Sequence, residues 1–273
     1  MAGRSTMLFE ILGPLRITEA GPLRITGRRH RILLIALLAR PNDIVGIQEL
    51  VDWLWARRPP RSGHSTLHGY ISGVRQALEP DHGPRHRDGR LITHPTGYQL
   101  CVEPEELDAL CFQRLVAAAK PALDRRDPAR AYLLASEALA LWRGQALADV
   151  AQIPAAQGAI TRLEELRLTA ITVRLEASLA LRRYLEVVPE LSGLIASYPL
   201  HERFYALLMV ALSRCGRRAD ALAIYRRAHV VLARELRVEP GPVLRQARAA
   251  IMAADGTDRS RGHLRRLPCR GPE

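Results

Sequence analysis

The chain has little lysine, few cysteines and no long apolar run, and each shortage excludes a class of protein. Lys120 is the one lysine among 40 basic residues, so the Gly-Lys-Ser/Thr ending of a phosphate-binding loop is missing and a P-loop nucleotide hydrolase is excluded. The four cysteines, Cys101, Cys111, Cys215 and Cys269, lie far apart and lack the paired spacing of a zinc site or a disulfide framework. We therefore expect no metal and no cofactor.

The sequence also lacks membrane and export signals. No stretch reaches the roughly 18 to 20 uncharged apolar residues that are needed to span a bilayer. Arginines within residues 28–31 interrupt the most apolar N-terminal run, and residues 1–12 lack the pattern of a signal peptide. We expect a cytoplasmic protein that makes no membrane contact.

What is present is the balance of a folded protein with a basic surface. The 273 residues are 48% hydrophobic and 25% charged, and this length is typical of about two domains. Basic residues number 40 against 28 acidic ones, which gives a net charge of +12. Such an excess of positive charge favours a polyanionic partner.

The first part of the chain opens with a repeated hexamer. Gly-Pro-Leu-Arg-Ile-Thr occupies residues 13–18 and returns unchanged at residues 21–26. Each copy places a Gly-Pro turn before an alternating apolar and polar run, which is typical of adjacent short strands in a small antiparallel sheet. An accidental duplication explains the same repeat, and both explanations make it part of the scaffold.

Three predicted helices follow the hexamers, and a predicted hairpin ends this region. The helices cover residues 28–39, 47–55 and about 62–80, and the hairpin covers residues 91–102. The prolines of the linker at residues 57–61 prevent the second helix from continuing. Strands, three helices and a terminal hairpin are, in this order, the elements of an α+β winged helix-turn-helix, which we predict over residues 7–102.

Residues 105–253 form a second predicted domain, in which every periodic segment is helical. Residues 182–188 correspond to residues 216–222 at an offset of 34, which is the period of tetratricopeptide repeats. We therefore predict an all-α, tetratricopeptide-like helical repeat that offers grooves to other proteins. Because its apolar periodicity is complete, we expect it to fold and self-associate without a strand partner. Residues 254–273 lack a periodic apolar face and are predicted to be a disordered basic tail.

Two sets of motifs resemble known bacterial regulators. Residues 91–100, Leu-Ile-Thr-His-Pro-Thr-Gly-Tyr-Gln-Leu, resemble the wing signature of OmpR-type DNA-binding domains. Motifs of the helical part resemble the bacterial transcriptional activator domain; they are Glu-Leu-Asp-Ala-Leu-Cys-Phe-Gln-Arg-Leu at residues 106–115, Ala-Leu-Ala-Leu-Trp-Arg-Gly at 138–144, Arg-Leu-Glu-Glu-Leu-Arg at 162–167 and Val-Glu-Pro-Gly-Pro at 238–242. Together they resemble a small member of the Streptomyces antibiotic regulatory protein family over about residues 7–252.

The resemblance implies a function that the residues alone do not fix. It implies a transcriptional activator that binds double-stranded DNA sequence-specifically, at direct repeats near a promoter, and recruits RNA polymerase holoenzyme. It also implies that the protein acts as a homodimer or as tandem protomers on DNA and controls a secondary-metabolite (antibiotic) biosynthetic gene cluster. No catalytic residue is expected of such a protein.

The third predicted helix is the candidate recognition helix. On a helical wheel of about 100° per residue, the residues predicted to be buried are Leu67, Tyr70, Ile71, Val74 and Leu78. The opposite face and its flanks carry the predicted DNA contacts, which are Ser65, His68, Gly69, Ser72, Gly73, Arg75 and Gln76. In the major groove, glutamine can pair with adenine and arginine with guanine. Further phosphate contacts are predicted at Arg57, Arg58 and Arg61 in the linker and at Thr93 and His94 in the hairpin.

The end of this helix departs from the family pattern. Where the family usually has a Ser-Arg-Leu-Arg-Arg-like run, residues 72–76 read Ser-Gly-Val-Arg-Gln, so Gly73 and Gln76 replace two basic residues. Gly69 also replaces a larger residue, and each glycine inside a helix costs about 1 kcal/mol relative to alanine. We expect either an unusually close approach of the backbone to DNA or a weakened reading of the DNA sequence.

Two alternatives remain open at this point. An enzyme is the first, because His64 and His68 have the i and i+4 spacing of metal ligands, although the sequence places no third ligand. The run from His201 to Tyr205 begins like a zinc-protease helix but has tyrosine where the second histidine is needed, and no Gly-x-Ser-x-Gly elbow is present. The second alternative is a helical-repeat adaptor for protein interactions whose DNA-binding domain is weakened.

Overall fold

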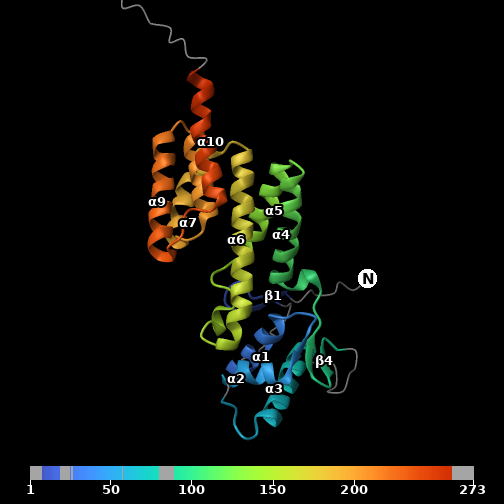
Figure 1. Cartoon of the computed structure of the whole chain (residues 1–273). Helices are drawn as coiled ribbons and strands as arrows, with labels where there is room; N and C mark the ends of the chain where they lie inside the picture. The colour runs from blue at the N-terminus through green and yellow to red at the C-terminus, as the bar shows by residue number, and fades with distance from the viewer. Residues whose placement is uncertain (1–7, 19–24, 26, 57, 80–88, 260–273) are drawn as a thin grey trace, which may run out of the picture. The chain divides into compact units, whose positions relative to one another are not determined.

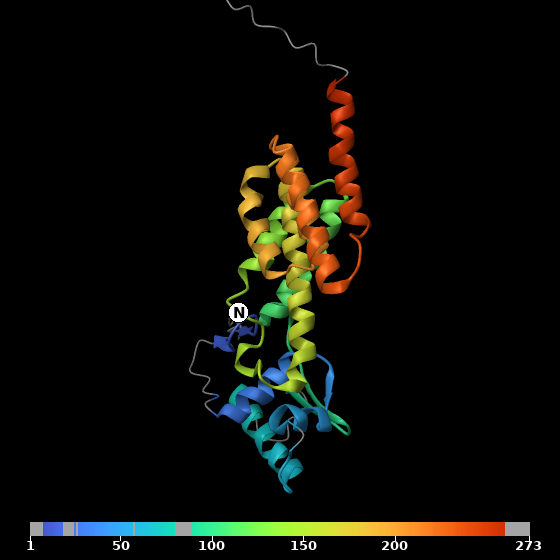
Figure 2. The ribbon, with the colours of Figure 1, turned by 60° about the vertical axis from the view of Figure 1, so that its left-hand side comes forward.

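The structure is a computed structural model that describes residues 8–18, 25, 27–56, 58–79 and 89–259 of the chain. Figures 1 and 2 show the ribbon from two directions. The chain divides into two compact units, residues 1–174 and residues 175–273, and the division falls inside one long helix. The sequence instead predicts a domain boundary near residue 104. The division into a DNA-binding domain and an activator domain at that residue stays a prediction.

The N-terminal segment forms a short antiparallel pair of strands, β1 (Leu8–Glu10) and β2 (Arg16–Thr18). The strand β2 lies in the first copy of the hexamer, but its partner is β1, in which Phe9 lies opposite Ile17. The second copy lies outside the described residues except for Ile25, which is buried.

The predicted helices and hairpin are present in the first unit. They are α1 (Arg28–Leu38), α2 (Ile47–Trp55), α3 (Gly63–Leu78), β4 (Leu91–His94) and β5 (Gly97–Leu100). A short strand, β3 (Ile44–Gly46), pairs with β5 and completes a three-stranded antiparallel sheet in the order β3-β5-β4. Gly97 is required at this point, because a Cβ atom there would lie 2.0 Å from the carbonyl oxygen of Val45.

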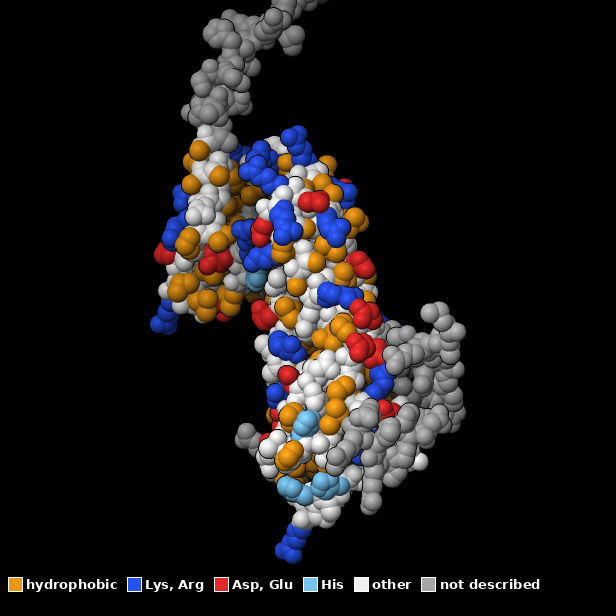
Figure 3. Space-filling view, turned by 90° about the vertical axis from the view of Figure 1, so that its right-hand side faces the viewer, with side chains coloured by type: hydrophobic (Ala, Val, Ile, Leu, Met, Phe, Trp, Pro, Cys, Tyr) orange, Lys and Arg blue, Asp and Glu red, His pale blue; other side chains and the backbone are white. Residues whose placement is uncertain are grey.

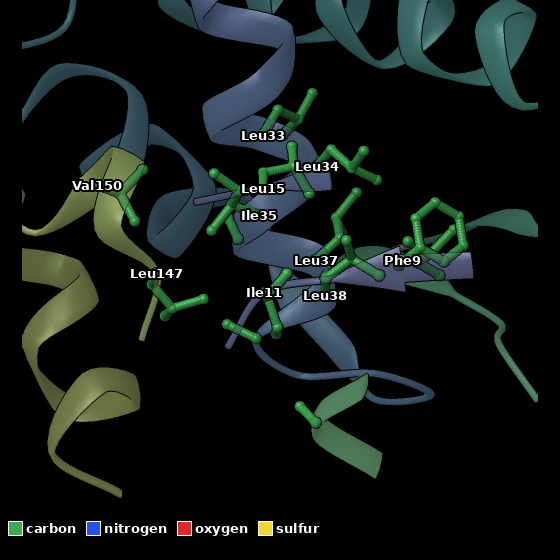
Figure 4. Packing of buried hydrophobic residues seen from close by; sticks show 14 of the residues in the cluster. Phe9, Ile11, Leu15, Leu33, Leu34, Ile35, Leu37, Leu38, Leu147 and Val150 are labelled. Atoms are coloured by element: carbon green, nitrogen blue, oxygen red, sulfur yellow. The ribbon is translucent and has the colours of Figure 1, made fainter. Parts of the chain in front are cut away.

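One hydrophobic core runs through the first unit and includes the N-terminal segment. Seven consecutive residues of α1, from Ile32 to Leu38, are buried. Figure 4 shows Ile11 and Leu15 of the N-terminal segment packed beside the leucines of α1, with Leu147 and Val150 nearby. The core therefore joins residues from the predicted DNA-binding part to residues from the predicted activator part.

Buried polar contacts fix this junction. The carboxylate of Asp108, which is 4% exposed, accepts hydrogen bonds of 2.9 Å from the backbone N–H groups of Ile11 and Leu12. Burial raises the pKa of Asp108, and these backbone donors oppose that effect. The backbone N–H of Arg143 donates to the carbonyl of Leu12, and that of Leu147 donates to the carbonyl of Ile11. In the folded chain the helical part is therefore bonded to the N-terminal segment, and folding of residues 105–253 without that segment stays a prediction.

The rest of the chain is helical. The helices of this part are α4 (Asp108–Asp124), α5 (Pro128–Ala140), α6 (Gln157–Ala180), α7 (Tyr184–Ser197), α8 (Glu202–Arg214), α9 (Arg218–Leu236) and α10 (Pro242–Arg259), and the short 3₁₀ turns are η1 (Pro104–Glu106), η2 (Ala148–Val150) and η3 (Pro154–Ala156). In the second unit α8 packs against α7, α9 and α10 and is buried over most of its length. The helix α10 includes residues 254–259, which the sequence assigned to the tail, and residues 260–273 lie outside the described part.

The same turn closes three helix hairpins, and this confirms the helical repeat. After α4, α6 and α8 the chain passes through a left-handed residue, with φ values of 64° at Arg126, 61° at Arg182 and 77° at Gly216. In each turn the next residue's N–H donates to the carbonyl five positions earlier, as Arg183 does to Ser178. Arg182 and Gly216 are the residues that begin the two segments related by the offset of 34.

Candidate nucleic-acid interface

Helix α3 presents three different sides to its surroundings, and the first is the buried one. Leu67, Ile71, Val74 and Leu78 are buried, as the wheel predicts. Tyr70 is only half-buried, because it lies at the margin of this face. Its ring makes an edge-to-face contact with His30 of α1 at a centroid distance of 5.1 Å and packs near Trp55 of α2 at 6.3 Å.

The second side of α3 is bonded to the β4–β5 hairpin. The Arg75 guanidinium Nη2 donates to the carbonyl of Leu91 at 3.0 Å and to Thr93 Oγ1 at 2.9 Å. Nearby, the hydroxyl of Tyr98 and His68 Nδ1 share a hydrogen bond of 2.7 Å. Burial raises the pKa of Tyr98, and the positive charge of Arg75 partly opposes this. Arg75, Thr93 and His68 therefore set the position of the hairpin relative to α3.

The third side of α3 faces α1, and Gly73 lies on it. A Cβ atom at Gly73 would lie 2.5 Å from His30 Nε2, and a Cβ atom at Gly27 would lie 2.5 Å from His30 Nδ1. The His30 ring fills the space left by these two glycines. The wheel placed Gly73 toward DNA; in the structure the position of its missing side chain is next to His30 of α1, and a contact of Gly73 with DNA stays a prediction.

A strip of α3 is left free between these two flanks. Ser65, Gly69, Ser72 and Gln76 are all exposed, and nothing lies within 4 Å of the position that a Cβ at Gly69 would take. Three of these residues have a very short side chain or none, so the backbone is accessible along the strip. Gln76 carries the longest side chain of the four.

Basic residues border the strip at its N-terminal end. Arg58 and Arg61 are exposed in the linker before α3, and His64 is exposed in its first turn; Arg57 lies outside the described residues. In the hairpin, His94 Nε2 shares a hydrogen bond of 2.8 Å with Gln99 Oε1. Figure 3 shows histidine side chains gathered at the lower part of the face drawn, beside hydrophobic ones. Basic groups thus lie next to the strip in the linker and in the first turn of α3.

Comparisons with known proteins identify the family. A family model described as "Bacterial transcriptional activator domain" matches residues 107–252. Regulatory protein DnrI of Streptomyces peucetius is 36% identical over 259 residues, which cover 93% of this chain and 95% of DnrI. Transcriptional regulator RedD of Streptomyces coelicolor is 37% identical over 248 residues, which cover 90% of this chain and 71% of RedD. The chain belongs to the Streptomyces antibiotic regulatory protein family of transcriptional activators.

Two longer proteins match nearly the whole of this chain over part of their own length. Regulatory protein AfsR of Streptomyces griseus is 38% identical over 255 residues, but the chain spans only 25% of AfsR. A solved structure, "Mycobacterium tuberculosis EmbR in complex with low affinity phosphopeptide", matches with a TM-score of 0.84 and 30% identity over 92% of this chain and 66% of that one. The relatives are transcriptional regulators, which supports a regulator rather than an enzyme.

Two residues that support α3 were not predicted from the sequence. His30 lies outside the predicted recognition helix, and only the tertiary structure brings it between Gly27 and Gly73. Tyr98 belongs to the hairpin motif, but the sequence gives no sign that its hydroxyl reaches His68. The signal that was available is Gly73, because a glycine inside a helix can mark a close contact.

The alternative of a metal-dependent enzyme finds no support in the described ranges. They contain no group of three His, Cys, Asp or Glu residues that could hold a metal ion. The His201 ring stacks on Phe204 at the start of α8, with a centroid distance of 4.1 Å. Across the same ranges, every helix is too short or too polar to cross a membrane.

Proposed function

We propose that this chain is a sequence-specific DNA-binding activator that reads the major groove with the free strip of α3. In this proposal α1–α3 and the β4–β5 hairpin act as a winged helix-turn-helix. The observation that carries the proposal is the strip of Ser65, Gly69, Ser72 and Gln76, which is exposed between two flanks that are both occupied by protein contacts. A helix held in this manner can lie in a groove about 12 Å wide without losing its support.

The residues of the site divide into those that read bases and those that position the helix. Gln76 has the amide that can pair with adenine, and Ser65 and Ser72 can bond to base edges or phosphates. Gly69 permits close approach of the backbone. Arg75 is bonded to the hairpin, so it holds the helix and the hairpin together instead of reading guanine.

Phosphate contacts supply the affinity in this proposal. Arg58 and Arg61 are exposed next to the strip, and Arg57 belongs to the same linker. Thr93 and His94 lie in the hairpin, where related folds contact the sugar-phosphate backbone. The protein then binds direct repeats near a promoter of a secondary-metabolite gene cluster, as a homodimer or as tandem protomers, and recruits RNA polymerase holoenzyme.

The test compares operator DNA with random DNA for matched variants. Gln76→Ala is expected to weaken operator binding by about 1–3 kcal/mol and to leave random DNA nearly unaffected, because it removes a base contact and no charge. Arg58→Ala together with Arg61→Ala is expected to weaken both DNAs and to reduce the salt slope by about 0.9 for each phosphate that the variant no longer binds. Fluorescence anisotropy at two salt concentrations measures both effects, and genomic mapping of binding sites supplies the operator.

An adaptor with weakened DNA binding is the second candidate. It is favoured by the strip itself, which carries no basic side chain, and by the internal bonds of Arg75. An adaptor would bind operator and random DNA equally and weakly. The adaptor is supported if the parent binds operator and random DNA with equal affinity and Gln76→Ala binds operator DNA as the parent does. The activator proposal then fails.

A further inference from the structure

The second unit contains a pocket that the proposed function does not use. The pocket has a volume of about 390 Å³ and lies where the turn between α6 and α7 meets the end of α8. Arg182, Arg183 and Arg214 line it together with Tyr184, Leu185, Glu186 and Cys215. Three arginines against one glutamate make it a positively charged pocket, and its size suits a few side chains rather than a large ligand.

Two of the three arginines, Arg182 and Arg214, have charges that no neighbouring side chain in the described part of the chain neutralises. Among the described residues, Arg182 and Arg214 form no ion pair and no side-chain hydrogen bond, whereas Arg203 and Arg217 on the same unit are paired with Glu176 and Asp220. Arg182 and Arg214 are both exposed. Guanidinium groups placed in this way can each take a carboxylate by two parallel hydrogen bonds.

The backbone at Arg182 has a conformation that favours glycine. Its φ of 61° lies in the left-handed region, where a Cβ atom is crowded and glycine is the favoured residue. The equivalent position in the next hairpin is Gly216, with a φ of 77°. Replacing Arg182 by glycine therefore removes its charge without straining the turn.

An apolar side chain lies beside the charges. Leu185 lines the pocket and is 75% exposed, although it belongs to the first turn of α7. Free phosphate or a nucleic-acid backbone would use the arginines but not the leucine. A polypeptide segment that carries carboxylates next to an aliphatic side chain uses both.

We infer that this pocket docks an acidic, leucine-containing segment of a partner protein. The carboxylates of the segment pair with Arg182 and Arg214, and its aliphatic side chain packs on Leu185. The site lies in the helical repeat and is independent of α3, so it is a protein contact of the activator in addition to its contact with DNA.

The test measures binding of a defined peptide to the full chain. The probe is a short fluorescein-labelled peptide in which pairs of glutamates alternate with single leucines, and its anisotropy is followed at low salt. One control peptide has glutamine in place of each glutamate, and a second has glycine in place of each leucine. The parent is expected to bind the probe and to bind each control peptide at least severalfold more weakly.

Arg182→Gly is the decisive variant, because it removes the charge and gives the turn the residue found in the next hairpin. It is expected to be at least as thermally stable as the parent, because glycine relieves the left-handed turn, and to weaken peptide binding about five- to tenfold. Arg214→Gln is expected to have a similar effect. Arg126→Gly makes the same backbone change in the turn after α4 and serves as the matched control, with peptide binding expected to stay as in the parent.

The other outcomes overturn the inference. They are an absence of peptide binding by the parent, equal binding by the parent and Arg182→Gly, and an equal loss in Arg126→Gly. If Arg182→Gly instead weakens binding of a labelled random duplex and leaves the peptide unaffected, the pocket is a nucleic-acid contact. Operator binding through α3 is measured in parallel, so failure of this inference is distinct from failure of the proposed function.

Discussion

The two compact units differ in the hydrogen bonds that stabilise each of them internally. In the first unit, Asp108 bonds to Ile11 and Leu12, and these partners lie 97 and 96 residues apart in the sequence. In the second unit, the corresponding bonds close turns between neighbouring helices, as in the bond from Arg183 to Ser178. The first unit therefore contains buried bonds between segments far apart in the sequence, whereas the turns of the second unit use a local bond, which also closes the α4–α5 hairpin of the first.

The N-terminal segment connects the predicted DNA-binding part to the predicted activator part. The N-terminal segment, residues 9–15, packs against α1 and also bonds to Asp108, Arg143 and Asp149. The start of the predicted activator region is thus built into the same core as the DNA-binding helices. The core of the first unit continues across residue 104, and whether the two predicted domains fold independently stays a prediction.

The largest expected effect comes from cutting the chain at the predicted domain boundary. A fragment of residues 105–253 loses the partners of Asp108 and exposes Phe112 and Leu147, which are at most 1% exposed in the full chain. We expect it to lose cooperative thermal unfolding, as measured by circular dichroism and calorimetry. A fragment of residues 175–259, which keeps its own core, is the control. A sharp transition of the longer fragment at the parent's temperature would contradict the comparison.

Asp108→Ala tests the long-range bonds without removing any element. It leaves two buried backbone N–H groups unpaired, and we expect it to lower the free energy of unfolding by about 3 kcal/mol. Asp149→Ala is the matched control, since its carboxylate also bonds to the N-terminal segment at Leu15 but is 29% exposed. Chemical denaturation should show a clearly smaller loss for Asp149→Ala, and equal losses would mean that burial of Asp108 is unimportant.

Gly216→Ala tests the local bonds of the second unit. Because residue 216 has a φ of 77°, an added Cβ is strained there, and we expect a loss of about 1 kcal/mol. Arg126→Gly makes the opposite change in the turn after α4 and is expected to raise stability by up to about 1 kcal/mol. Urea denaturation of both variants checks the signs, and two changes of the same sign would show that the turns are not equivalent.

The smallest expected effect compares the two glycines of α3. In Gly69→Ala the added Cβ atom points into open space. This variant is expected to stabilise the protein by up to about 1 kcal/mol, because alanine has a higher helix propensity than glycine. Gly73→Ala meets His30 at 2.5 Å, so we expect no gain or a loss. His30→Ala in the same background should restore the gain. A gain for Gly73→Ala equal to that for Gly69→Ala would return Gly73 to the free strip.

Local patterns predicted the helices and the hairpin well. The apolar spacing of α3 identified Leu67, Ile71, Val74 and Leu78 as buried, because neighbours on one face of a helix share an environment. The wheel cannot show which neighbouring element lies beside a flank, so it gave no indication that His30 lies next to Gly73. It also counted Arg75 among the DNA contacts, whereas the folded chain bonds that side chain to Leu91 and Thr93.

The sequence by itself determined the order of elements, the family and the repeat, since periodicity, turn residues and motifs are properties of short segments. The offset of 34 between Arg182 and Gly216 reappears as the same left-handed turn. Only the tertiary structure decided which polar groups are used inside the protein. Whether Arg75 or Asp108 meets solvent, DNA or a distant strand depends on contacts between segments far apart in the chain, and such contacts leave no periodic trace in the sequence.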